Sequence, residues 1–184
     1  MKHPAFLTLG GIAFVVALAA APIVSAAQPA PAPTMVPMSK PDFSSMAFLV
    51  GTWNCTQPLR GKTRPDTTVN TMSPDGMWML SKDTAPPFDQ YRTVTVESTG
   101  YTGYDPTVKQ WVQLGVDNTG GYGWGSSPGW QGNTITWTGK NLDGSTTTDV
   151  ITKTSDTETS DVNTTVDAQG KTTNTVTITC KKAG

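Results

Sequence analysis

The sequence predicts an all-β domain that closes into an antiparallel up-and-down barrel. Short segments of alternating polar and apolar residues recur after residue 50, and each is followed by a turn rich in Gly, Pro, Asp or Asn. Two cysteines add a second observation, because Cys55 lies near the start of these segments and Cys180 near their end. We expect them to form a disulfide, which requires the first and last strands to be close, as they are in a closed barrel.

We expect roughly eight to ten strands, a number suited to a closed barrel. The expected strands lie at 52–57, around 69, at 77–81, 91–104, 111–116, 120–125 and 134–138, around 150 and 162, and at 172–181, after a short helical turn at 43–50. In the last strand Val176, Ile178 and Cys180 share one face, which we expect to be buried. A two-sheet sandwich is the competing architecture, but the succession of hairpins and the cysteine pair favour the barrel.

Residues 1–27 predict a secretory signal peptide. Lys2 and His3 precede an apolar run over 5–21, and small residues at 24–27 offer cleavage after Ala26 or Ala27. An uncleaved anchor is the alternative, but the run falls below the ~20 apolar residues of a membrane span. Residues 28–41 form a Pro/Ala-rich linker, and the barrel domain is expected over 42–184. The predicted product is exported to the periplasm or the extracellular space, without membrane attachment after cleavage.

Cleavage would also change the chemical inventory of the chain. The only histidine, His3, leaves with the signal, which excludes a Ser-His-Asp triad and histidine-containing zinc sites from the mature protein. A bridge between Cys55 and Cys180 would leave no free thiol for catalysis. The mature chain keeps 12 basic and 14 acidic residues and has no polybasic run, so neither nucleic acid nor an anionic membrane is a supported partner. We therefore predict no enzyme, no metal site and no cofactor.

Most carboxylates are expected in turns, where an Asp side chain caps its own backbone. This group includes Asp83, Asp89, Asp105, Asp117 and Asp143. Glu97 shares its parity with Thr93 and Thr95 and is expected to face solvent. A catalytic carboxylate would have to point into the barrel with a raised pKa, and the sequence pattern indicates no such residue.

Three segments resemble a known family. Residues 48–54 (Phe-Leu-Val-Gly-Thr-Trp-Asn) resemble the Gly-x-Trp start of the first strand in lipocalins and their calycin relatives. Segments 103–112 and 129–137 are similar to mid-barrel hairpins of exported bacterial calycin-like proteins, with a more distant likeness to nitrobindin-like proteins. Gly51 would allow a tight bend, and Trp53 would plug one end of a lipocalin-like barrel. In the resembled family a charged side chain of the last strand often stacks on this tryptophan, and Lys182 is the candidate.

The resemblance implies a barrel that binds a small apolar or amphipathic ligand. One related branch holds haem through a histidine, which the mature chain lacks. Tyr or Met side chains are possible iron ligands in principle, but nothing in the sequence singles one out.

Five residues are candidate ligand contacts. Arg92 is in phase with Val94 and Val96 and would meet an acidic head group inside the barrel; the alternative is a position at the barrel mouth with the guanidinium in water. The other four are aromatic: Trp111, Tyr122, Trp124 and Trp130. Most barrel aromatics belong to the core, but the Gly- and Ser-rich segment 120–129 suits a mouth that grips a ligand. The segment 83–88 is expected to form another part of the rim.

The leading functional hypothesis is an exported, non-enzymatic protein that holds a small hydrophobic or amphipathic molecule in its barrel. The first alternative is a structural or interaction module of the envelope, whose barrel is filled by its own side chains. The second is a histidine-free barrel enzyme of the cyclase or isomerase type. The sequence does not identify which protein partners the chain has.

Overall fold

Antiparallel strands make up most of the part of the chain that the structure describes. The computed structural model describes residues 39–90 and 92–184, so the predicted signal peptide and all but the last three residues of the predicted linker lie outside it. The elements are η1 (Ser44–Leu49), β1 (Gly51–Leu59), β2 (Lys62–Met72), β3 (Met79–Ala85), β4 (Val96–Asp105), β5 (Gln110–Asp117), β6 (Tyr122–Ser127), β7 (Trp130–Gln131), β8 (Thr134–Lys140), β9 (Thr146–Ser155), β10 (Glu158–Val166) and β11 (Thr172–Lys182). The predicted all-β class is confirmed.

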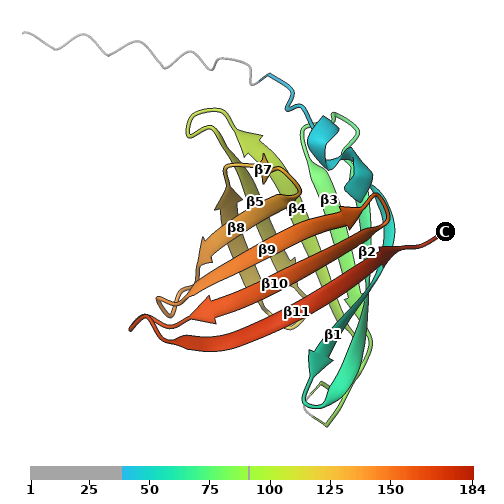
Figure 1. Ribbon diagram of the computed structural model, residues 1–184, viewed down its shortest axis with the longest axis vertical. Coiled ribbons are helices and arrows are strands. Elements are labelled where there is room, and N and C mark those ends of the chain that lie inside the picture. Colours follow the sequence, from blue (N-terminus) through green and yellow to red (C-terminus); the bar gives the residue numbers. More distant parts are fainter. Residues whose placement is uncertain (1–38, 91) are drawn as a thin grey trace, which may run out of the picture. The chain divides into compact units, whose positions relative to one another are not determined.

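The sheet closes into a barrel because its two ends meet. Each long strand pairs with the next along the chain, and β11 returns to pair with β1 (Figure 1). Closure on the other side comes from Ser126 of β6, which lies opposite Thr138 of β8. The short strand β7 pairs only with β8 and is additional to the ten strands of the barrel. The predicted closed antiparallel up-and-down barrel is confirmed.

The disulfide joins the first and last strands. Cys55 lies directly opposite Cys180 in the β1–β11 ladder, and the two sulfur atoms are bonded. This is the predicted pairing. Both cysteines face the barrel interior, so every second residue on either side of them along β1 and β11 is also an interior position.

A short 3-10 helix, η1, packs against one end of the barrel. Its buried Met46 joins a core cluster with Met79, Trp111, Ile135 and Trp137. Side chains from the barrel wall bind the end of the helix, since the Leu49 carbonyl accepts hydrogen bonds from Trp53 Nε1 (2.8 Å) and Asn70 Nδ2 (3.0 Å). These bonds satisfy a carbonyl that the helix itself leaves unpaired.

The Gly-x-Trp segment lies at this same end. Gly51 has φ +122°, a value that favours glycine, and an added Cβ would lie 3.0 Å from Cε of Lys182. Trp53 is 2% exposed. Lys182 pairs with Trp53 in the β1–β11 ladder, and its Nζ lies 5.6 Å from the Trp53 ring centroid while donating a hydrogen bond to the Phe48 carbonyl (2.8 Å). The expected cationic side chain of the last strand therefore does stack on this tryptophan.

The segment before β4 is the main departure from the predicted strands. β4 begins only at Val96, and residues 92–95 belong to the connection that follows Pro86 and Pro87. Arg92 forms an isolated bridge with Asp89, and Val94 is 57% exposed. Of the two positions considered for Arg92, the inward one on a strand does not occur, because residue 92 lies in a turn before β4. Residues 83–85, predicted as rim loop, are the end of β3.

Candidate functional site

The barrel interior is hollow beneath η1. An inner hollow of about 280 Å³ lies against the helix, and an outer hollow of about 420 Å³ extends from it. The two share four lining residues, which are Ser81, Asp83, Gln113 and Trp137. Protein sites for small molecules commonly measure ~300–1,000 Å³, so the two spaces together fall within that range.

The inner hollow has an apolar wall on the side of η1. The aromatic and aliphatic residues that form it are Met46, Leu49, Trp53, Met79, Trp130, Ile135, Trp137, Ile151 and Ile178. Polar side chains share this lining, among them Thr68, Asn70 and Thr102. A molecule in this space would therefore meet both apolar rings and polar groups.

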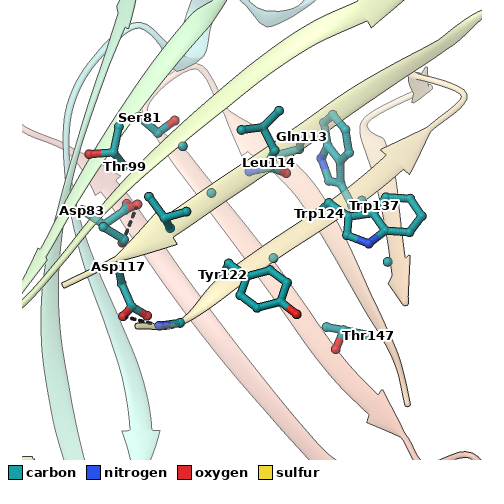
Figure 2. Close-up of a pocket in the computed structure, with 18 of the residues that line it drawn as sticks. Ser81, Asp83, Thr99, Gln113, Leu114, Asp117, Tyr122, Trp124, Trp137 and Thr147 are labelled. Atoms are coloured by element: carbon teal, nitrogen blue, oxygen red, sulfur yellow. Dashed lines mark hydrogen bonds between the residues drawn. The ribbon is translucent and has the colours of Figure 1, made fainter. Parts of the chain in front are cut away.

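Glycines create the space of the outer hollow. Gly100, Gly115 and Gly123 lie side by side on β4, β5 and β6, at interior positions where any other residue would project a side chain. Asp117, the last residue of β5, also lines this hollow (Figure 2). So does Asn141, in the turn after β8. Because strand direction alternates, the turns after β5 and β8 lie at the end of the barrel opposite η1.

Besides Asp117 at the end of β5, four aspartates line the hollows from within strands. Asp66 and Asp161 line the inner hollow, Asp149 lines the outer one, and Asp83 lines both. Their ladder partners are also interior residues: Cys55 for Asp66, Thr68 for Asp83, Trp137 for Asp149 and Ile178 for Asp161. The expectation that no carboxylate points inward is therefore wrong. Asp83, predicted to cap a turn, is instead a residue of β3.

Asp66 and Asp83 interact on neighbouring strands. Thr68 Oγ1 donates to Asp83 Oδ1 (2.6 Å) and Ser98 Oγ donates to Asp83 Oδ2 (3.3 Å). Burial and the negative charge of Asp83 raise the pKa of Asp66 above its ordinary value, although the cation of Arg64 opposes the shift. Arg64 is itself buried, and burial lowers its pKa.

Asp149 and Asp161 form a second pair on β9 and β10. Asn163 Nδ2 donates a short hydrogen bond to Asp149 Oδ1. Burial raises the pKa of Asp149, and burial together with the charge of Asp149 raises the pKa of Asp161 to about 7. Asp161 is therefore ready to gain or lose a proton near neutral pH.

The predicted ligand contacts are dispersed over the barrel. Trp111 belongs to the core cluster, and Trp130 lines the inner hollow. Tyr122 and Trp124 are 58% and 59% exposed and both contribute to the lining of the outer hollow (Figure 2). Arg92 lines neither hollow. A ligand role for these residues stays a prediction.

The turn carboxylates are placed as predicted at three positions. Asp117 Oδ1 accepts hydrogen bonds from the backbone of Gly121 (2.9 Å) and from Thr119, and these bonds lower its pKa. Asp105 accepts from the backbone of Thr107, and Asp143 from that of Ser145. Glu97 is exposed, as expected.

Comparison with known proteins adds no assignment. No protein-family model matches the chain, and no curated protein matches it significantly. Within residues 39–90 and 92–184, no helix is long and apolar enough to cross a membrane. In the same described part, no group of three or more His, Cys, Asp or Glu side chains is placed to hold a metal ion.

Proposed function

We propose that the chain is an exported, non-enzymatic binding protein that holds a small amphipathic molecule inside its barrel. The observation that carries the proposal is the pair of connected hollows, which are lined by both apolar and polar side chains. The disulfide supports export, because such bonds persist in oxidising compartments. The volume of the hollows counts against a barrel filled by its own side chains.

Native mass spectrometry of the protein purified from its own cell envelope tests this proposal. We expect a population heavier than the polypeptide, which loses the extra mass on unfolding. Gly100→Leu is the matched control, since a Cβ at this position lies 3.6 Å from the Cβ of Ser81, and a leucine side chain would extend into the outer hollow. Absence of bound mass in the wild-type protein, or equal bound mass in Gly100→Leu, would contradict the proposal.

A second candidate function is favoured by one observation. The Asp149–Asp161 pair supplies the inward carboxylates that a histidine-free cyclase or isomerase would need for proton transfer. The two functions are separated by incubating the extracted ligand with wild-type protein and with Asp161→Asn. Conversion of the ligand by the wild type alone favours the enzyme, and recovery of unchanged ligand from both favours the binding protein.

A further inference from the structure

The four interior aspartates are arranged as two pairs on separate parts of the wall. Asp66 lies two residues from Thr68, which is directly opposite Asp83, so Asp66 and Asp83 are diagonal neighbours. In the same way, Asp161 lies two residues from Asn163, which is directly opposite Asp149. Diagonal neighbours in an antiparallel ladder lie ~7 Å apart, close enough for their charges to interact. Strands β1 and β11 separate the two pairs.

In each pair, one carboxylate accepts a hydrogen bond from a neighbouring side chain, and the other has a buried oxygen without a partner. Asp83 accepts hydrogen bonds from Thr68 and Ser98, and Asp149 accepts one from Asn163. Oδ1 of Asp66 and Oδ1 of Asp161 are buried and have no hydrogen-bond partner among the described residues. Buried polar atoms in folded proteins are nearly always paired, so two orphaned acceptors in one hollow indicate that a donor comes from outside the chain.

Among the described residues, the side chains that line the hollows include carboxylates but no cationic group. Neither lining includes a Lys or Arg side chain of the described residues. Arg64 lies two residues from Asp66 on β2, but it lines neither hollow. Like charges held together in a space of low dielectric repel each other, and a bound cation would relieve that repulsion at both pairs.

The apolar wall narrows the chemistry of that cation. Trp53, Trp130 and Trp137 line the same inner hollow as Asp66 and Asp161. Ammonium groups interact favourably with carboxylates and with the faces of aromatic rings, and methylene groups pack against both rings and aliphatic side chains. β2 and β10 are three strand spacings apart, or about 14 Å along the curved wall. Because the wall is curved, side chains that point inward from these two strands lie closer together than their backbones do.

We propose that the barrel binds an aliphatic diamine, with one ammonium group at the Asp66–Asp83 pair and the other at the Asp149–Asp161 pair. This inference rests on the proposed binding function and names its ligand class. The orphaned Oδ1 atoms accept hydrogen bonds from the two ammonium groups, while the connecting methylene chain lies against the tryptophan rings. A fatty acid, by contrast, would add a fifth carboxylate to these four.

Isothermal titration calorimetry of the full, disulfide-bonded chain near pH 8 tests the inference. The probes are cadaverine, a five-carbon diamine; pentylamine, which lacks one ammonium group; and valerate, the corresponding carboxylate. We expect cadaverine to bind at least about tenfold more tightly than pentylamine. Its second ammonium group donates hydrogen bonds to a charged carboxylate, and such bonds are stronger than those between neutral groups. Valerate is expected not to bind in the same concentration range.

Two variants locate the binding. Asp66→Asn and Asp161→Asn should each weaken cadaverine binding by about tenfold and leave pentylamine binding at the opposite pair. Asp143→Asn is the matched control, because it makes the same change of charge in an exposed turn and should have no comparable effect. Circular dichroism of each variant establishes that the barrel is folded.

The outcomes distinguish failure of the diamine proposal from failure of the proposed binding function. Equal affinities for cadaverine and pentylamine, or unchanged affinity in both interior variants, would overturn the diamine proposal. Binding of Ca²⁺ that displaces cadaverine at equal concentration would overturn it as well, in favour of an inorganic cation. If valerate binds and the amines do not, the binding function stands and the diamine inference fails. If no probe binds and the protein from its envelope carries no ligand, the binding function itself fails.

Discussion

Replacement of Asp161 by asparagine is expected to stabilise the barrel at alkaline pH and to have little effect at acid pH. Burial and the charge of Asp149 raise the pKa of Asp161 from 3.8 to about 7. The folded chain therefore binds this proton more strongly than the unfolded chain does. The resulting stability is fully present below about pH 4 and is lost as the pH rises through about 7. The asparagine side chain is neutral over this whole pH range, so the variant does not lose this stability at alkaline pH.

The size of the effect follows from the shift. Three pKa units correspond to about 4 kcal/mol at most, at 1.36 kcal/mol for each unit. Screening by solvent in the open hollow reduces this value, so we expect Asp161→Asn to gain about 2 kcal/mol relative to wild type between pH 4 and pH 8. Asp66 and Asp149, whose pKa values are also raised, add to the alkaline loss of stability in the wild type.

Urea unfolding at pH 4 and pH 8, with the disulfide intact, measures this difference. At each pH, the free energy of unfolding of the wild type is subtracted from that of the variant. The two differences, at pH 4 and at pH 8, are then compared. Asp143→Asn is the control, because local hydrogen bonds lower the pKa of this exposed residue and its replacement should bring no gain at pH 8. A difference for Asp161→Asn that does not vary with pH, or a loss at pH 8, would refute the assignment of a buried, proton-binding carboxylate.

Three further predictions concern the frame of the barrel. Replacing Cys55 and Cys180 together by serine should lower the free energy of unfolding by about 4–5 kcal/mol in the chain-entropy model for a loop of 125 residues, measured by thermal or urea unfolding; an unchanged midpoint would contradict this. Lys182→Met should cost about 1–2 kcal/mol through loss of the hydrogen bond to η1 and of the ring contact, and an equally stable variant would show that neither matters. Gly103→Ala should displace the Trp78 ring, which an added Cβ would approach to 2.6 Å, so the variant should be less stable and its tryptophan fluorescence shifted; an unaltered spectrum would contradict the contact.

The closed barrel was predictable because its determinants are local or covalent. Alternating residues and turn-forming residues mark the hairpins, and Cys55 and Cys180 connect the first strand to the last. The start of β4 was not predictable in this way. Val94 and Val96 alternate as strand residues do, but Pro86 and Pro87 precede a turn that reaches Arg92, and only Val96 enters the ladder.

The interior aspartates escaped prediction because their strands invert the usual pattern. On β10 the apolar Val162 faces out and is 37% exposed, while Asp161 and Asn163 face in. Assigning apolar residues to the interior therefore selects the wrong face of this strand. Counting residues from the hairpin turn at 167–170 does not correct this, because it would place Asp161 opposite Thr177, on the outward face of β11. A bulge between Thr165 and Val166 shifts the pairing by one residue, so that Asp161 lies opposite Ile178, which shares the face of Cys180. The inward carboxylate was therefore not predictable without knowledge of this bulge.

A crystal structure of the protein isolated from its own envelope, at neutral pH, tests the binding-site interpretation most directly. We expect electron density in the connected hollows, with donor atoms about 2.7–2.9 Å from Oδ1 of Asp66 and of Asp161. A barrel interior filled by side chains from neighbouring strands, with the two carboxylates hydrogen-bonded to groups of the chain itself, would contradict it.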